Sequence, residues 1–312
     1  MRITNRMIVD DSISKMSDSL ARLYDLQKKA STGKKYLNAS DDPSNASAVF
    51  TLKSTLQISQ VYETTTQNSN DWMEASDFAM QHAADLTQKA ISASLKGLSD
   101  TAGADSRKTL AAEVDGLLKE AIDVANTKHL DRYIFSGFTT NIVPFKPENT
   151  DITDPSKVTG ILFKGTNYLT NPLPLPAFQS IRRDVGPGDT ITVNTNGFTT
   201  FNKLLQTLIN VRDALDSNNM VNLRIGTADL NIALNDVTLA STINGSRMRT
   251  LEAAQERITT SNTEIKALLS QKEEVNMAEV MALLKNQENV YQTVVTIASR
   301  TQSMMNLFDT LR

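Results

Sequence analysis

The longest regular pattern in this 312-residue chain is a row of positions whose spacing alternates between four and three residues. It begins at Leu230 and ends at Leu269, and such alternation is typical of an α-helix that packs through one narrow seam. At 1.5 Å per residue, a helix of this length extends roughly 60 Å, which favours an elongated protein over a globular one. The positions of the row are Leu230, Leu234, Val237, Ser241, Asn244, Met248, Leu251, Gln255, Ile258, Asn262, Ile265 and Leu269.

Both ends of the chain carry shorter seams of the same kind. The first is expected in a helix over residues 1–30 and contains Ile13, Met16, Leu20, Leu23 and Ala30. The second fits one register of spacings three and four, which reaches almost to the last residue. Its positions are Val280, Leu283, Gln287, Val290, Val294, Ile297, Thr301, Met304, Phe308 and Leu311. Paired seams at the two termini indicate that the two ends of the chain come together.

Between these seams, turn and capping residues divide the chain into further helices. In the stretch "STGKKYLNASDDPSNAS" (31–47), Gly33 can close one helix, while Asp42 and Pro43 suit the start of the next. We interpret the neighbouring pair of aspartates as capping residues and not as an acid–base pair. The patterns predict helices over 44–99, from a cap at Asp105 or Ser106 to near His129, and from Phe201 to Leu215. A loop is predicted over residues 216–227, before the long row begins.

The composition changes in the middle of the chain. Seven of the eight prolines lie between Pro144 and Pro187, and half of the twelve glycines lie between Gly137 and Gly197. Alternating strand patterns occur in "GILFKG" and "DTITVNT", where Ile191 and Val193 share one face. These features predict a small β-rich insertion over residues 138–198 within a mainly α-helical fold.

No pattern for enzymatic chemistry stands out. The chain has no cysteine and only two histidines, so thiolate sites and multi-histidine metal sites within one chain are excluded. The stretch "GILFKGT" has the glycine spacing of a phosphate-binding loop but lacks the lysine that should follow Gly165. The net charge of −3, with mixed signs throughout, gives no basic stripe for nucleic acid. We therefore expect no catalytic residues, no cofactor, no metal and no nucleic-acid or membrane partner.

The N-terminal stretch "MRITNRMIVDDSISK" has no apolar run of the kind found in signal peptides and carries two aspartates. No stretch approaches the ~20 apolar residues that a membrane span requires. The terminal seams also lack a large core beside them. Two such helices alone are poorly covered, and we hypothesise that they are disordered or loosely helical in the monomer and order against other chains.

Several separated motifs resemble the bacterial flagellin superfamily. The motifs are "MRITNRM" and "STGKKYLNASDDPSNASAV" near the start, "NGSRMRTLEAAQERI" (244–258) in the long row, and "VVTIASRTQSMMNLFDTLR" at the end. Within that superfamily, "RYIFSGFTTNIVPF" (132–145) and "GFTTFNKLLQTLINVRDAL" (197–215) are more similar to the junction proteins between hook and filament than to flagellin. The resemblance covers nearly the whole chain, and the β insertion carries least of it.

The resemblance implies three domains and no enzymatic activity. A terminal coiled-coil domain would comprise residues 1–40 and 276–312, a helical rod domain residues 41–137 and 199–275, and an outer β domain residues 138–198. Members of this family form a ring between hook-associated protein 1 and the flagellin filament, outside the cell. They leave the cytoplasm through flagellar type III export without a cleaved signal peptide, and an export chaperone binds their C-terminal region.

On this interpretation, the two terminal seams form the interface between subunits, within one chain or between neighbouring chains. The expected interface residues are Ile13, Met16, Leu20, Leu23, Val290, Val294, Ile297, Met304, Phe308 and Leu311. Three alternatives remain open: a flagellin filament subunit, an exported effector or adhesin with an enzymatic β domain, and a general coiled-coil scaffold. The β segment shows no catalytic constellation, and a scaffold does not account for the "DDPSNAS" break.

Overall fold

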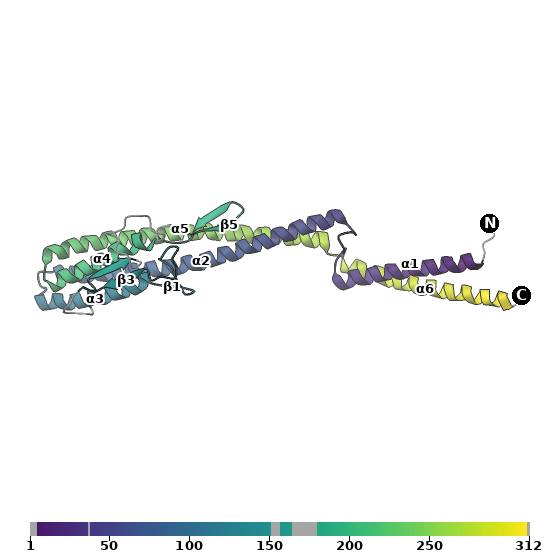
Figure 1. Ribbon diagram of the computed structural model, residues 1–312, viewed down its shortest axis with the longest axis horizontal. Helices are drawn as coiled ribbons and strands as arrows, with labels where there is room; N and C mark the ends of the chain where they lie inside the picture. Colours follow the sequence, from purple (N-terminus) through teal and green to yellow (C-terminus); the bar gives the residue numbers. More distant parts are fainter. Residues whose placement is uncertain (1–4, 37, 151–156, 164–179, 311–312) are drawn as a thin grey trace. The chain divides into compact units, whose positions relative to one another are not determined.

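The computed structural model describes residues 5–36, 38–150, 157–163 and 180–310 (Figure 1). Helices dominate these residues and the strands are short, so the predicted mainly α fold with a small β portion is confirmed. The helices are α1 (Asn5–Thr32), α2 (Pro43–Leu98), α3 (Ala104–Ala125), α4 (Gly197–Asp216), α5 (Met220–Glu273) and α6 (Met277–Thr310). The strands are β1 (Lys128–His129), β2 (Arg132–Tyr133), β3 (Phe145–Glu148), β4 (Gly160–Phe163), β5 (Arg182–Gly186) and β6 (Asp189–Thr192).

The chain forms two compact units. The terminal unit comprises Met1–Ile58 and Thr260–Arg312, and the central unit comprises Ser59–Thr259. The three-domain division expected from the sequence concerns functional parts of the molecule, and it stays a prediction.

The break between α1 and α2 follows the expected turn chemistry. Gly33 adopts a φ of 70°, in the left-handed region that favours glycine, and its N–H bonds the carbonyl of Lys29 at 2.9 Å. The Asp42 carboxylate accepts a hydrogen bond of 3.1 Å from the backbone N–H of Asn45 at the start of α2. The hydrogen bonds from Asn45 lower the pKa of Asp42, as expected for a capping carboxylate. The prediction that this aspartate caps a helix is confirmed.

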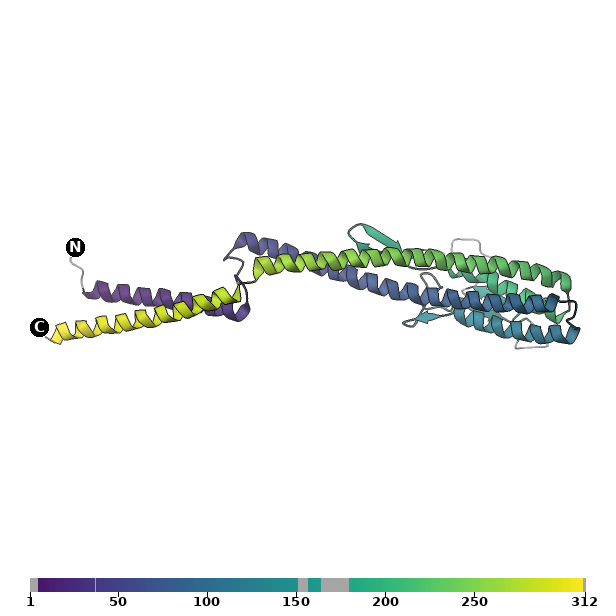
Figure 2. The same cartoon turned by 180° about the vertical axis from the view of Figure 1, so that it is seen from behind.

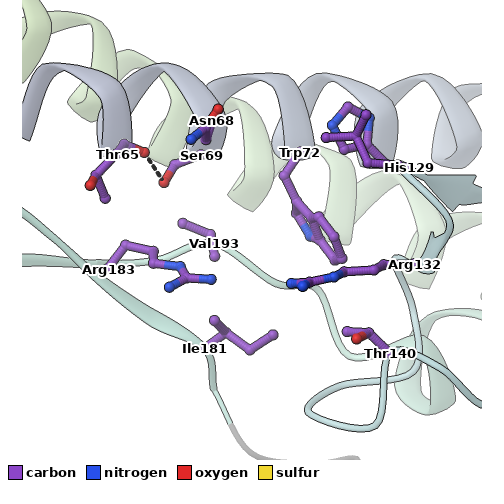
Figure 3. A pocket seen from close by; sticks show the side chains of 11 residues that line it. Thr65, Asn68, Ser69, Trp72, His129, Arg132, Thr140, Ile181, Arg183 and Val193 are labelled. Carbon is purple, nitrogen blue, oxygen red and sulfur yellow. Dashed lines mark hydrogen bonds between the residues drawn. The ribbon is translucent and has the colours of Figure 1, made fainter. Parts of the chain in front are cut away.

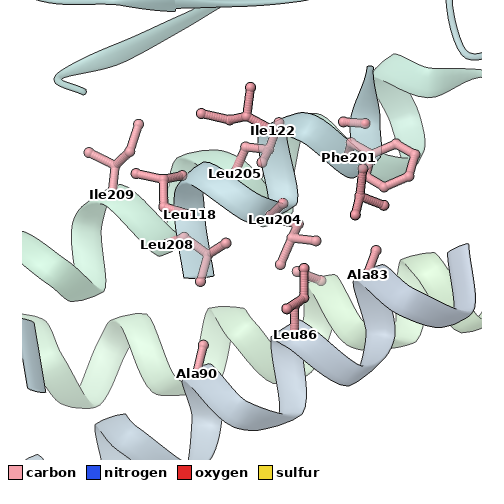
Figure 4. Close-up of a cluster of buried hydrophobic side chains, with 14 of the residues drawn as sticks. Ala83, Leu86, Ala90, Leu118, Ile122, Phe201, Leu204, Leu205, Leu208 and Ile209 are labelled. Atoms are coloured by element: carbon pink, nitrogen blue, oxygen red, sulfur yellow. The ribbon is translucent and has the colours of Figure 1, made fainter. Parts of the chain in front are cut away.

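The core of the central unit is formed by apolar side chains of α2, α3, α4 and α5 (Figure 4). Aromatic rings mark its centre: Phe201 of α4 lies 4.6 Å from the ring of Phe135 and 6.0 Å from that of Phe145, between ring centroids. Phe145 of β3 also contacts Phe163 of β4 at 5.0 Å. The strands β3 and β4 therefore pack their apolar side chains into the same core as the helices.

An ion-pair cluster joins α3 to α4. Arg212 of α4 is 3% exposed, and its guanidinium lies 3.0 Å from the carboxylate of Asp115 in α3. Burial alone would raise the pKa of Asp115, but hydrogen bonds from Lys119 and Arg212 outweigh this and hold the pKa below its ordinary value. Because Arg212 is buried, its charge requires these carboxylate partners.

Polar residues of the long α5 row act as expected for residues that set a register. The Asn244 side chain is fully buried and donates a hydrogen bond of 2.8 Å to the carbonyl of Met73 in α2. Three residues earlier, the Ser241 hydroxyl donates to the Asp77 carboxylate at 2.7 Å. A shift of one helix along the other would break both bonds, so these contacts fix one alignment of α2 with α5.

Several helix ends differ from those expected. The cap of α3 is Gly103 and not Asp105 or Ser106, and no side chain bonds the first turn. This helix ends at Ala125 and not near His129, because the Asn126 side chain pairs with the backbone of Phe145 through two hydrogen bonds of 2.8 and 2.9 Å. The residues that follow turn into the β1–β2 hairpin.

The two later helices begin earlier than predicted. The Asn196 side chain accepts a hydrogen bond from the Phe198 N–H, so α4 starts at Gly197 and not at Phe201. Asn219 caps α5 in the same way, through the N–H of Asn222 at 3.1 Å. The sequence interpretation had placed a loop over residues 216–227, most of which is helical.

The described strands form three antiparallel two-stranded ladders. Two of the strands, β4 and β6, coincide with the predicted patterns "GILFKG" and "DTITVNT". Ile191 of β6 and the nearby Val193 are both buried, as the alternation required, and they pack with Val185 of β5 and with Met73. The hairpin β5–β6 thus has a small apolar cluster of its own in the central unit.

Candidate assembly surface on the terminal helices

The terminal helices α1 and α6 lie side by side in both views of the structure (Figures 1 and 2). Within the terminal unit they bring the first and last helices of the chain together, as the paired sequence seams predicted.

The seam of α6 is shifted from the expected register. Four positions of the row, at Val280, Gln287, Val294 and Thr301, are buried or half-buried as expected. The alternate positions are Leu284, Tyr291 and Ala298, each one residue later than predicted. Successive residues of a helix are rotated by 100° about its axis. Leu284, Tyr291 and Ala298 therefore lie on one side of the central row of Val280, Gln287, Val294 and Thr301, and the predicted residues one position earlier lie on the other side.

The seam of α1 is also shifted by one residue, but toward the N-terminus. Ser12, Met16, Ser19, Leu23, Leu26 and Ala30 are buried or half-buried at spacings of four and three residues. Met16, Leu23 and Ala30 were predicted, whereas Ser12 and Ser19 take the places expected for Ile13 and Leu20. Leu20 is half-buried beside Ser19, and Ile13 is 54% exposed.

A polar contact lies in the middle of this seam. The Gln287 side-chain amide of α6 donates hydrogen bonds to the hydroxyl of Ser19 at 2.9 Å and to its backbone carbonyl at 3.1 Å. Ser19 is only 6% exposed. Because a one-turn shift would leave these polar groups without each other, the pair sets the register of α1 along α6.

The second side of α6 is an exposed apolar row, which we call the open flank. It consists of Leu283, Val290 and Ile297, which are 47%, 42% and 57% exposed. Their spacing of seven residues keeps them on one face of the helix, next to the seam that α1 covers. Helix α6 therefore presents two adjacent apolar rows, and within the described residues only one is covered.

The expected interface residues thus fall into three groups. Met16, Leu20, Leu23 and Val294 are half-buried in or beside the seam. Ile13, Val290 and Ile297 are exposed. Met304 and Phe308 belong to α6, but their side chains lie outside the described set, and Leu311 lies outside the described residues. Their role between subunits stays a prediction.

A cluster of charges joins the start of the chain to the end of α5 in the terminal unit. The Glu273 carboxylate lies 2.7 Å from the ammonium of Lys34 and 2.8 Å from that of Lys53. Backbone hydrogen bonds continue this contact, from the Lys35 N–H to the Glu273 carbonyl at 2.8 Å and from the Val275 N–H to the Gly33 carbonyl at 3.0 Å. Hydrogen bonds from Lys34 and Lys53 lower the pKa of Glu273. No sequence pattern predicted this cluster, since its members are far apart along the chain.

The described residues hold no group of three or more histidine, aspartate or glutamate side chains that could bind a metal ion. Among the described helices, none combines the length and the apolar character of a membrane span. The open flank of α6 is an exposed apolar row of the kind that packs against another helix.

Comparisons with known proteins show what the chain is similar to. Residues 4–140 match the model of the bacterial flagellin N-terminal helical region. The chain is 24% identical over 229 residues to flagellar hook-associated protein 3 of Salmonella typhimurium, a match that covers 73% of this chain and 65% of that protein. It is 26% identical over 149 residues to flagellar hook-associated protein 3 of Escherichia coli, covering 47% of each chain. The matches thus span less than two thirds of either relative.

Among solved structures, FlgL of Bacillus cereus superposes with a TM-score of 0.57 at 18% identity, covering 70% of this chain and 99% of that one. At this identity the similarity establishes the fold. Together these matches confirm the resemblance to flagellar hook-associated protein 3 and to the flagellin N-terminal helical region.

Proposed function

We propose that this chain is a structural protein of the bacterial flagellum that forms the junction between hook and filament. Two observations support the proposal: the similarity to proteins named hook-associated protein 3, and the open flank of α6. The similarity favours this role over that of a flagellin filament subunit. We expect no enzymatic activity, since its role would be to join neighbouring proteins.

The open flank is the observation that carries the proposed mechanism. Leu283, Val290 and Ile297 form a continuous apolar row that α1 leaves uncovered. Apolar rows of this kind on a helix are removed from water by packing against a second helix. A neighbouring copy of the chain would supply that helix, so that each α6 contacts its own α1 on one side and another subunit on the other.

The proposed partners follow from this position. Copies of the chain would form a ring that contacts hook-associated protein 1 on the hook side and flagellin on the filament side. An export chaperone would cover the C-terminal region before export through the flagellar type III apparatus, without a cleavable signal peptide. In the free chain, α1 and α6 would be disordered or loosely helical, and they would order on association.

Substitutions in the two rows of α6 test the mechanism. In the bacterium that makes the protein, Ile297→Asp should leave the central unit folded but block incorporation, because a carboxylate would be buried between subunits. We expect the same of Val294→Asp and Phe308→Asp. The matched control is Ser299→Asp, which adds the same charge at an exposed position on another face of α6. Motility and electron microscopy of the filaments provide the measurement.

The outcomes separate the alternatives. Loss of filaments, with flagellin released into the medium, in Ile297→Asp but not in Ser299→Asp supports the proposal. Normal filaments in Ile297→Asp and Val294→Asp cells would refute the proposed use of α6. Antibody labelling at the hook boundary alone identifies a junction protein, whereas labelling along the whole filament would show that the chain is flagellin. Strong hydrogen-exchange protection of residues 5–30 and 280–310 in the dilute monomer would contradict ordering on association.

A further inference from the structure

A cleft of about 440 Å³ opens on the central unit, away from the residues used in the proposed assembly (Figure 3). Its wall comes from three separate segments: α2, the β1–β2 hairpin with the loop that follows it, and the chain around β5 and β6. The volume is within the range of pockets that hold small ligands. Neither the comparisons nor the proposed role in the flagellum assigns a ligand to it.

The side chains that line the cleft are basic or neutral. Arg132 of β2 and Arg183 of β5 extend toward one another from opposite sides, and His129 lies nearby (Figure 3). Neither arginine forms an ion pair within the part of the chain that the structure describes, and no described lining residue is acidic. Two guanidinium groups that face each other repel unless an anion lies between them. Arginine pairs with a carboxylate through two parallel hydrogen bonds, which suits this arrangement.

Trp72 forms another part of the wall and carries an unused hydrogen-bond donor. Its indole N–H is shielded from solvent and meets no acceptor among the described residues. Polar Asn68 and Thr140 line the cleft together with apolar Ile181 and Val193. An aromatic ring with polar and apolar neighbours suits a ligand that is polar at its edges and apolar on one face, as a sugar ring is.

The backbone of the hairpin that lines the cleft is strained. Leu130 and Asp131 form the two-residue turn between β1 and β2 with φ values of 47° and 61°. Glycine and asparagine usually occupy such positions, and a residue such as leucine is costly there. Strain of this kind is found more often at binding sites than elsewhere, and here it places His129 and Arg132 on either side of the turn.

The geometry points to a binding site for a carboxylated monosaccharide of the uronic acid class. The carboxylate would lie between Arg132 and Arg183, and the sugar ring would pack against the Trp72 indole. This inference stands independently of the proposed function, because it concerns the central unit of the free chain and requires no assembly.

Trp72 makes the test direct, since it is the only tryptophan in the chain. Titration of the intact protein with D-glucuronate in the millimolar range should change its fluorescence in a saturable way. D-glucose, acetate and a short glutamate-rich peptide are the reference probes, and each should give a response at least about tenfold weaker, since each lacks part of the expected contact set.

Substitutions identify the arginines that bind. Arg132→Gln or Arg183→Gln should weaken glucuronate binding by about tenfold or more, because each removes a charge-assisted contact. Both side chains are exposed, so the fold should be retained. The matched control is Arg182→Gln, also exposed on β5 but absent from the cleft wall, and its affinity should stay unchanged.

Three results would overturn the inference: no saturable change with glucuronate, an equal response to glucose, or affinities that the Arg132 and Arg183 substitutions leave intact. Saturation by the acidic peptide but not by glucuronate would also overturn it, and would identify the cleft as a contact for a protein carboxylate.

Discussion

The central and terminal units are both dominated by helices with apolar rows, but they differ in how fully those rows are covered. In the central unit, Phe201, Leu204 and Leu208 are fully buried, because α4 is packed among α3, the strands and other helices. In the terminal unit, α1 and α6 have mainly each other, so Met16 and Val294 are only half-buried and Ile297 is exposed. Helical periodicity alone does not reveal this difference, which depends on the number of neighbouring elements.

The largest expected effect comes from opening a cavity in the central core. Phe201→Ala removes the ring that contacts Phe135 and Phe145 and should lower the free energy of unfolding by about 3–5 kcal/mol. Denaturant unfolding followed by Trp72 fluorescence measures it, because that residue reports on the central unit. Leu20→Ala on α1 should leave this transition in place. An equal shift in both variants would show that the two units unfold as one.

Changing Gly197, where two backbone segments approach closely, should affect the stability of the central unit less. Gly197 begins α4, and a Cβ at this position would collide with the carbonyl oxygen of Phe135. Gly197→Ala should therefore destabilise the central unit by about 1–3 kcal/mol in the same experiment.

Gly245 in α5 provides the control, since nothing lies within 4 Å of a Cβ built there. Gly245→Ala should be neutral or stabilising by up to about 1 kcal/mol, because alanine favours helix more than glycine does. If both variants behave alike, the contact between Gly197 and Phe135 does not constrain the fold.

The smallest expected change in stability comes from the charge cluster of the terminal unit. The pKa of Glu273 is lowered by hydrogen bonds from Lys34 and Lys53, so its contribution to stability is present above the unfolded pKa of about 4.3. That contribution is lost as pH falls through the lower, folded pKa. Because both lysines are nearly half-exposed, we expect less than about 1 kcal/mol.

Thermal melting of the helical circular dichroism signal between neutral and acidic pH measures this dependence. Glu273→Gln should melt earlier than the native chain at neutral pH, and the difference should shrink in acid. Glu274→Gln is the control, because Glu274 forms no ion pair with any described residue. An unchanged profile for Glu273→Gln would show that the cluster adds no stability.

Periodicity and turn chemistry predicted most helices and the cap at Asp42, since these depend on residues close together in the sequence. The end of α3 depends on a side-chain contact between Asn126 and the distant Phe145, so the pattern that continued to His129 was misleading. The β1–β2 hairpin was missed because its turn has Leu130 and Asp131 where glycine or asparagine would be the signal.

The seam registers of α1 and α6 could not be read from the sequence for a different reason. Apolar residues lie on both sides of the central row of α6, at Leu283 and at Leu284, for example, and either set satisfies the heptad pattern. The choice is made by the partner helix, where Ser19 pairs with Gln287. The Arg132–Arg183 cleft was missed because its wall combines segments about forty or more residues apart, each unremarkable alone.

The contact between Ser19 and Gln287 has a consequence for how the chain's ends find each other. Two helices that contact each other only through apolar side chains can shift along one another at a small cost in free energy. Each shifted alignment would expose a different set of side chains. A single polar pair within the apolar seam selects one alignment, since its hydrogen bonds form only when the two helices are aligned in that way. Every copy of the molecule would then show the same outward face to its neighbours, which is what a regular array of identical parts demands.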